Sequence, residues 1–372
     1  MRIGIDARFN RSPGVERYYS ALMKNLLLID KRNEYVVYYP SLEHLAHNRI
    51  DQKNVNSIML PAHIYSFREQ FLLAYRIRKD RIDVFHATNS WVTPIFCPCP
   101  LVVTIHDMCP KTHPELIKRR ARTYSKFMLP YAVWAADKIL TVSEYSKKEI
   151  VKFYPQAEQK IWVTYNGVDP VFREVKNHDE IEATKKSYGI EGEYILYIGA
   201  IMKHKNILGL IRAYKQLPSS LKSRYMLLII GRKIPDHDEI FNEVLKAIGG
   251  ETIQLIQFVR QRDLPFLYSG ATAFVFPSKQ EGFGIPLVEA MASGLPIISS
   301  NCTVMPEICG DAAIYFSPES LDSMKNAIEQ ILTDKDLREK LSNIGFERSK
   351  RFSWNISARK TLNIYEEAYK QK

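Results

Sequence analysis

The chain has 372 residues, more than one hydrophobic core usually organises, so two domains are the first expectation. Its 46% hydrophobic and 25% charged residues are ordinary for a globular protein, and no run of about 18 apolar residues marks a membrane span. The net charge of +11 comes without a zinc-finger spacing, an aromatic ribonucleoprotein motif or a long basic arm, which argues against nucleic acid as the partner.

Strand-like and helix-like segments alternate along the first half of the chain. Arg2, Asp6 and Arg8 interrupt the first apolar stretch, so it does not fit a signal peptide and we expect a cytoplasmic protein. Strands separated by amphipathic helices predict a parallel sheet that is covered on both faces. The predicted strands of this half are 2–7, 35–40, 83–87, 101–107 and 138–143, with a helix over 15–29.

Five cations lie close together in the segment KRRARTYSK, and no acidic residue occurs between Leu116 and Ala136. The cations are Lys118, Arg119, Arg120, Arg122 and Lys126. Two interpretations stay open. The segment is either a solvated helix surface or a site for anionic lipid headgroups, which would place the protein at the inner membrane face.

The strand and helix pattern repeats after a charged, turn-rich stretch. The predicted strands of the second half are 194–199, 225–231, 252–258, 273–277 and 296–300. A closing helix carries Trp354, Ala358, Leu362 and Tyr365 at helical spacing and is expected to bury that stripe. The predicted organisation is a first domain over 1–175, a linker over 176–192, a second domain over 193–352, and a C-terminal helix over 353–372 that is able to pack back on the first domain.

The stretch QEGFGIPLVEA, residues 280–290, connects a predicted strand to a predicted helix. Ligands of open parallel sheets bind outside the carboxyl ends of the strands. Glycines at 282 and 284 let a ligand approach the main chain, and free amides at a helix start receive phosphate. On these grounds alone, two interpretations of Glu281 and Glu289 stay open. Both contact substrate, or Glu281 is merely an acid of a glycine turn and Glu289 an acid that complements the dipole of the helix.

The segment EGFGIPLVEAMASGLPIISS resembles the E-x7-E signature of family-four retaining glycosyltransferases, which are enzymes of the GT-B fold. Further landmarks of that family are matched by TIHDMCPKTHP, VSEYSKKEI, YNGVDP, YIGAIMKHKN, DLPFLYSGATAFVFPS and the closing FSW helix. The resemblance covers nearly the whole chain. It implies an α/β protein with two Rossmann-like parallel-sheet domains that face a central cleft, the first on the acceptor side and the second holding the donor.

The resemblance assigns roles to several residues of the second half. Glu281 would contact the transferred sugar near its reacting carbon, and Glu289 would hold the ribose. Lys205 matches the family's diphosphate lysine, where a cation would neutralise charge that builds on the leaving group; a plain surface lysine is the alternative. The other donor contacts implied are the backbone at Phe283, Gly284 and Ile285, and Val259 and Arg260 near the base.

Two residues of the first half complete the expected site. His106 ends the strand LVVTI and matches a histidine that contacts the donor sugar or its phosphates, the alternative being a histidine satisfied locally. Gly14 is predicted in a loop ahead of the helix, where the family has a glycine-rich loop near the donor phosphates. Two departures from the family pattern are Ala200 and His204, which stand where arginine is common, so Lys205 and the helix amides would hold more of the diphosphate.

The implied reaction is transfer of a hexose with retention at the anomeric carbon. We expect neither a metal nor a further cofactor, because a lysine and helix amides can hold a diphosphate. The HDMCP and KHKN variants resemble mannosyl- and rhamnosyl-transferring members of bacterial polysaccharide pathways, so GDP-mannose is the first candidate donor and a glycan or lipid-linked glycan the acceptor. A sugar-nucleotide epimerase or hydrolase of related fold and a non-catalytic sugar-nucleotide-binding protein stay open as alternatives.

Overall fold

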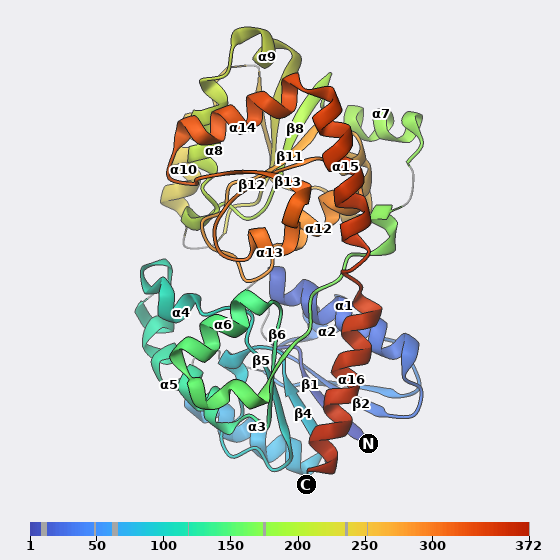
Figure 1. The fold of residues 1–372 in the computed structure, drawn as a ribbon. Coiled ribbons are helices and arrows are strands. Elements are labelled where there is room, and N and C mark those ends of the chain that lie inside the picture. Colours follow the sequence, from blue (N-terminus) through green and yellow to red (C-terminus); the bar gives the residue numbers. More distant parts are fainter. Residues whose placement is uncertain are drawn as a thin grey trace. The chain divides into compact units, whose positions relative to one another are not determined.

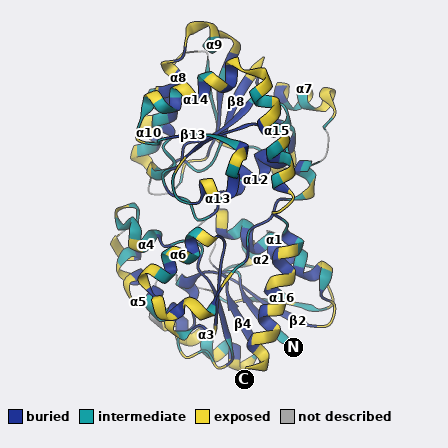
Figure 2. Cartoon of the chain, viewed as in Figure 1, coloured by how far each residue is buried: buried dark blue, intermediate teal, exposed yellow. Residues whose placement is uncertain are grey.

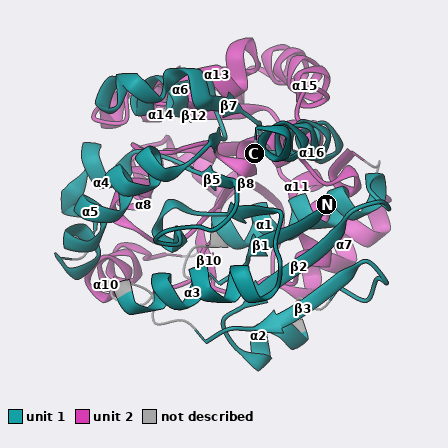
Figure 3. Ribbon diagram, turned by 90° about the horizontal axis from the view of Figure 1, so that it is seen from below, with its two compact units in different colours: residues 1–167, 353–372 teal, residues 168–352 magenta. Residues whose placement is uncertain are grey.

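A computed structural model describes residues 1–8, 13–47, 50–61, 66–117, 119–173, 176–234, 237–250 and 252–371 of the chain. The chain forms two compact units (Figure 3). Unit 1 consists of Met1–Gly167 and Ser353–Lys372, and unit 2 of Val168–Phe352. Each unit is built on one parallel β-sheet with helices on both of its faces (Figure 1).

The described part of unit 1 contains a seven-stranded sheet in the order β3-β2-β1-β4-β5-β6-β7. Its neighbouring strands are parallel, as the alternation of strands and helices predicts. The five predicted strands are confirmed, whereas the two edge strands, β3 and β7, were not predicted. The strands are β1 Arg2–Asp6, β2 Glu34–Tyr39, β3 Val55–Met59, β4 Val84–Ala87, β5 Leu101–Thr104, β6 Lys138–Thr141 and β7 Ile161–Val163.

Alternate side chains of these strands face two different sets of helices. Val36 and Tyr38 of β2 share a core with Leu73 of α3 and Leu129 of α5. The helices α1 and α16 pack against one another, and α16 also contacts β4 and β5. The helices of unit 1 are α1 Pro13–Ile29, α2 Leu42–His47, α3 Phe67–Lys79, α4 Cys109–Thr112, α5 Arg119–Ala135, α6 Glu144–Phe153 and α16 Trp354–Lys370.

The C-terminal helix α16 belongs to unit 1, where it lies along α1 (Figure 1). Of its predicted stripe, Trp354, Ala358 and Tyr365 are buried. Leu362 is only half-buried because Thr361 takes the inward position instead. The Tyr365 hydroxyl lies 2.6 Å from Nδ1 of the buried His86, so a polar bond as well as apolar packing fixes this helix on the sheet.

The described part of unit 2 contains a six-stranded parallel sheet in the order β10-β9-β8-β11-β12-β13. Figure 2 shows its central strands buried and the outer faces of its helices exposed. The edge strand β13 was again not predicted. The strands are β8 Glu193–Ile198, β9 Tyr225–Ile230, β10 Ile253–Ile256, β11 Ala273–Phe276, β12 Ile297–Ser300 and β13 Ala313–Phe316.

Helices cover both faces of this second sheet. One face packs on α8, α10 and α14, where Tyr197 and Leu227 meet Leu210 and Ile328. The other helices include the contacting pairs α7 with α11 and α12 with α15. The helices of unit 2 are α7 His178–Ser187, α8 Ile207–Lys215, α9 Ser219–Arg224, α10 Asp238–Ala247, α11 Leu264–Ser269, α12 Ile285–Ala292, α13 Met305–Cys309, α14 Leu321–Thr333 and α15 Lys335–Ser349.

The predicted linker over 176–192 is instead part of unit 2. It contains α7, which the Asn177 side chain caps by accepting a hydrogen bond from the Asp179 amide. The helix contacts α11, and Ile190 behind it is buried. The charged residues that suggested a linker therefore belong to the exposed side of a capped helix. The division between the units falls between residues 167 and 168 rather than at 175.

Within the described segments, no helix combines the length and the apolar character that a membrane-spanning helix requires.

Candidate active site

Each sheet has a point where the order of its strands reverses, and ligands of such sheets bind there, outside the carboxyl ends of the strands. In unit 2 the reversal lies between β8 and β11. The loops that follow these two strands meet, because the Lys279 amide donates to the His204 carbonyl at 2.7 Å. The two segments singled out in the sequence, KHKN and EGFG, are thus brought to one place by the fold.

Lys205 and Glu281 form an ion pair at this reversal point, between Nζ and Oε1. Their side chains are 18% and 12% exposed, and the ammonium also faces the Phe276 ring at 6.0 Å from its centroid. An ammonium has three N–H donors and a carboxylate two oxygens, so each partner can bind a ligand while the pair persists. The pair can therefore offer a cation to a phosphate and an acceptor to a sugar hydroxyl at adjacent positions.

The glycine turn after Glu281 ends at the N-cap of α12. Gly284 has φ of +84°, a left-handed conformation that L side chains rarely adopt. The side chains of Phe283 and Ile285 are buried, the former edge-on to Phe352 at 5.7 Å. Contact of these three residues with a diphosphate, which the resemblance implies, therefore falls to their main chain and stays a prediction.

The second glutamate of the signature, Glu289, lies deeper in α12 than an acid that complements the helix dipole would. With α12 beginning at Ile285, Glu289 lies beyond the first turn and not within it, because Pro286 occupies the second helical position. Glu289 is 1% exposed, and its Oε2 accepts a hydrogen bond of 3.1 Å from the buried Tyr268 hydroxyl of α11. Contact of Glu289 with a ribose stays a prediction.

Tyr268 was missed by the sequence reasoning. It lies 21 residues before Glu289 on another helix, and no local pattern links the two positions. Its ring packs on Phe172 and Phe274, at 5.5 and 5.6 Å between centroids, which fixes the direction of its hydroxyl. We infer that Tyr268 positions the Glu289 carboxyl group.

Changing Tyr268 to Phe is expected to lower the free energy of unfolding of unit 2 by about 1–3 kcal/mol, because a buried carboxyl group loses a donor. Urea unfolding followed by fluorescence would measure it. Tyr194→Phe is the matched control, since the buried Tyr194 donates at 2.7 Å to the neutral Leu267 carbonyl. A loss for Tyr268→Phe no larger than for Tyr194→Phe would show that the Glu289 bond has no special strength.

The predicted base-binding residues lie in the loop after β10. Val259 is half-buried and Arg260 is exposed. The Arg260 Nε donates at 2.8 Å to Asp263, which also accepts from the Tyr188 hydroxyl at 2.7 Å. Burial acts to raise the pKa of Asp263, but these two hydrogen bonds outweigh it and the pKa is lowered. The carboxylate that anchors this loop therefore stays charged at neutral pH.

His106 of unit 1 follows β5, and its ring stands edge-on to Tyr18 at 4.9 Å. Burial lowers the pKa of His106 to about 4, although its bond to the Thr88 carbonyl acts in the opposite direction. The ring is neutral at pH 7 as a result. Because the carbonyl 2.9 Å from Nε2 can only accept, Nε2 carries the proton and Nδ1 is left as an acceptor for a hydroxyl.

Three further positions that the sequence singled out are Gly14, Ala200 and His204. Gly14 is exposed and is the second residue of α1, not part of a preceding loop, because the helix begins at Pro13, a residue suited to the first helical position. Ala200 follows β8, where its carbonyl lies 3.5 Å from the Tyr197 hydroxyl. His204 is half-buried and holds the β11 loop through its carbonyl.

In the described ranges, no three His, Cys, Asp or Glu side chains are grouped so that they could hold an ion. Asp-x-Asp triplets occur at 236–238 and at 334–336, so the sequence by itself does not argue against a metal. Asp334 caps α15 by accepting from the Leu337 amide at 2.9 Å, and Asp238 pairs with Lys233, while Asp236 lies outside the described residues.

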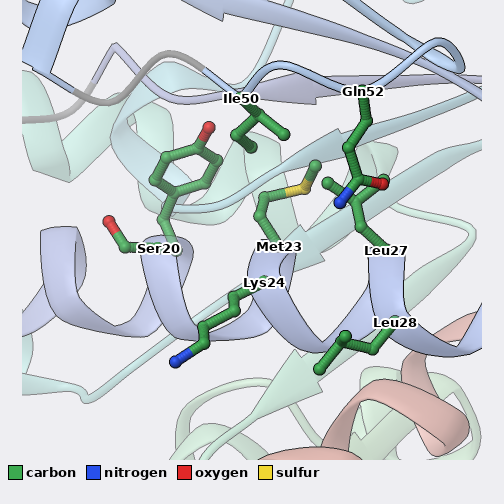
Figure 4. Close-up of a pocket in the computed structure, with 8 residues that line it drawn as sticks. Ser20, Met23, Lys24, Leu27, Leu28, Ile50 and Gln52 are labelled. Carbon is green, nitrogen blue, oxygen red and sulfur yellow. The ribbon is translucent and has the colours of Figure 1, made fainter.

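A cavity of about 290 Å³ lies elsewhere in unit 1 (Figure 4). Met23 and Leu27 of α1 point toward Ile50 and Gln52 across it. The cavity runs along the side of α1 and not at the carboxyl ends of the strands, so we assign no substrate to it.

Comparison with known proteins agrees with this arrangement. Residues 180–348 match the model of "Glycosyl transferases group 1", and residues 13–172 match that of "Glycosyltransferase Family 4". The O-antigen chain mannosyltransferase B of Escherichia coli is 31% identical over 95% of both chains.

Two solved structures share the fold. A glycosyltransferase from Rickettsia africae superimposes with a TM-score of 0.78 at 21% identity, covering 100% of this chain and 99% of that one. HepE of Anabaena, solved in complex with UDP-glucose, gives 0.78 at 17% identity over 98% and 99%. Fold and family together define a glycosyltransferase with the GT-B architecture of two Rossmann-like parallel-sheet domains. The chain belongs to glycosyltransferase family 4.

Proposed function

We propose that this glycosyltransferase is a retaining, metal-independent hexosyltransferase. Its donor is a nucleoside diphosphate sugar, with GDP-mannose as the first candidate, and its acceptor is a glycan or lipid-linked glycan of a bacterial polysaccharide. The observation that carries the proposal is the Lys205–Glu281 pair at the strand reversal of unit 2. The likeness to an O-antigen mannosyltransferase supports the choice of donor sugar, and the UDP-glucose bound by HepE supports the class of donor.

The proposed chemistry assigns a task to each group. Lys205 and the main-chain amides at Phe283, Gly284 and Ile285 donate to the diphosphate and stabilise the charge that grows on it as the bond to the anomeric carbon breaks. Glu281 accepts a hydrogen bond from a sugar hydroxyl and favours the positive charge that develops on the ring. His106, through Nδ1, accepts from another substrate hydroxyl.

Retention follows from front-face departure and attack. The bond from the anomeric carbon to the phosphate oxygen breaks, the acceptor oxygen bonds to the same face, and the acceptor proton passes to the leaving phosphate. A double displacement would instead need a carboxylate nucleophile on the far face. Glu281 is held by Lys205, which favours a positioning task over nucleophilic attack.

The donor is to be identified with a panel of GDP, UDP, dTDP and ADP sugars, tested by thermal shift without metal. One nucleotide is expected to stabilise the wild type by about 2.7 kcal/mol at a hundred times its dissociation constant. Glu289→Gln is expected to lose that response, and it is preferable to Glu289→Ala because it keeps a partner for Tyr268. A panel with no response, or a Glu289→Gln variant that responds like the wild type, would contradict the donor assignment.

The reaction itself is tested with the identified donor and an acceptor extract, with the product anomer read by NMR. An inverted anomer would refute retention, and activity abolished by a chelator and restored by a divalent ion would refute metal independence. Conversion of the donor without an acceptor would favour the epimerase or hydrolase, and binding without turnover in any extract would favour the binding protein.

A further inference from the structure

Unit 1 carries large apolar side chains that are exposed on two neighbouring helices and the segment between them. Trp134 is 75% exposed, Phe96 74%, Tyr75 66% and Phe127 62%. Exposed apolar side chains that occur singly are common on proteins, but a group of them marks an interaction site. The aromatic face consists of Phe71, Leu72 and Tyr75 of α3, Phe96, and Phe127 and Trp134 of α5.

The face is continuous from α3 to α5. The rings of Phe71 and Phe96 lie 6.1 Å apart, and the Phe96 amide donates at 2.9 Å to the hydroxyl of Tyr131 on α5. The Tyr131 ring in turn lies 5.9 Å from that of Trp134. Figures 1 and 3 show α3 and α5 side by side in unit 1. The opposite sides of both helices are committed to the core, since Leu73 and Leu129 are buried there.

Cations share this surface. On α5, Arg119, Arg120 and Lys126 are exposed, and the helix contains no acidic residue. On α3, Arg68 and Lys79 are exposed and stand three to four residues from the apolar positions, on the same side of the helix. Lys118, which the sequence grouped with these cations, lies outside the described residues.

The one acid of α3 does not offset this charge. Glu69 is buried and forms an ion pair with Arg8, and its other oxygen accepts from Gln70 at 2.9 Å. The face is therefore both apolar and cationic.

We propose that this face docks on the surface of a bilayer that contains anionic lipid. Aromatic side chains favour the boundary between headgroups and acyl chains, and exposed cations are attracted to the negative surface potential. A protein partner fits less well, because the centre of a protein interface is depleted in charged residues. The sequence pointed to the cations, and the structure adds the aromatic side chains that would enter the boundary.

The test is co-sedimentation of the full chain with phosphatidylcholine vesicles and with vesicles that also contain phosphatidylglycerol. The wild type is expected to bind the anionic vesicles preferentially. The charge variant Arg119→Gln/Arg120→Gln/Lys126→Gln is expected to lose about fivefold in affinity per cation, or about a hundredfold in total. The aromatic variant Phe96→Ser/Phe127→Ser/Trp134→Ser is expected to lose at least about tenfold, with little dependence on salt.

Matched controls come from exposed positions elsewhere. Lys335→Gln/Lys340→Gln/Lys350→Gln removes the same charge from unit 2, and Leu245→Ser/Ile356→Ser/Tyr369→Ser removes exposed apolar side chains from other helices. Both controls are expected to bind like the wild type.

Three results would overturn the proposal. The first is that the wild type binds neither kind of vesicle, and the second is that the test variants bind vesicles no more weakly than the controls do. The third is that the wild type forms a dimer which only the aromatic variant dissociates, while that variant binds vesicles like the wild type. The donor thermal shift in the same variants reports on the donor site separately, so failure of this proposal is distinguishable from failure of the proposed function.

Discussion

Replacing Glu281 by Gln is expected to lower kcat by about 10²- to 10³-fold while changing the dissociation constant of the nucleoside diphosphate by less than about threefold. Gln keeps the size of the side chain and can still accept a hydrogen bond from Lys205. What it removes is the negative charge beside the reacting sugar. The expected loss falls on the turnover number because that charge matters most when positive charge develops on the ring.

The measurement is steady-state kinetics with the donor identified above, together with calorimetric binding of the free nucleoside diphosphate. Glu193→Gln is the matched control, since Glu193 lies at the amino end of β8, away from the carboxyl-end loops, and pairs with Arg224 on the surface at 2.6 Å. The control is expected to keep the wild-type kcat. Equal losses of nucleotide binding and turnover in Glu281→Gln would indicate that the Lys205–Glu281 pair is only structural.

Lowering the pH from about 7.5 to about 5 is expected to destabilise unit 1 by roughly 4 kcal/mol through two histidines. Burial, with a smaller effect of His106, lowers the pKa of His86 to about 3, and burial lowers the pKa of His106 to about 4, from an ordinary 6.5. The unfolded chain binds more protons than the folded chain between these values. Stability is therefore complete above about pH 6.5 and is lost as the pH falls toward about 4 for His106 and about 3 for His86, by about 2 kcal/mol for each histidine at pH 5.

Thermal or urea unfolding of unit 1 as a function of pH would measure this slope. His86→Gln separates the histidine effect from the titration of carboxylates, because Gln does not titrate and can still bond to Thr104 and Tyr365, the two partners of His86. In this variant, the free energy of unfolding that is lost between about pH 7.5 and about pH 5 is expected to be smaller by about 2 kcal/mol, which is half of the histidine contribution. An unchanged slope would show that His86 is not neutral and buried in solution.

The positions of most strands along the chain and of the loops at their carboxyl ends were accessible from sequence, because both depend on local patterns. Alternation of apolar runs with amphipathic segments predicted ten strands of the two described sheets, which are the nine interior strands and the edge strand β10. The other three edge strands of these sheets, β3, β7 and β13, escaped prediction, since an edge strand has one neighbour and is less buried. β3 shows this most clearly, because none of its residues is buried. The same limit made α7, polar on its exposed side, look like a linker.

The sequence by itself determined the fold class, the family resemblance and the two loops in which Lys205 and Glu281 lie, because strand, helix and turn signals act over a few residues. Only the tertiary structure decided which side chains meet. Lys205 pairs with Glu281 across 76 positions, and Tyr365 reaches His86 across 279. Contacts of this kind arise when whole helices and strands pack, and no periodicity along the chain records them. The burial of Glu289 under Tyr268 and the joining of α3, Phe96 and α5 into one exposed face were decided in the same way.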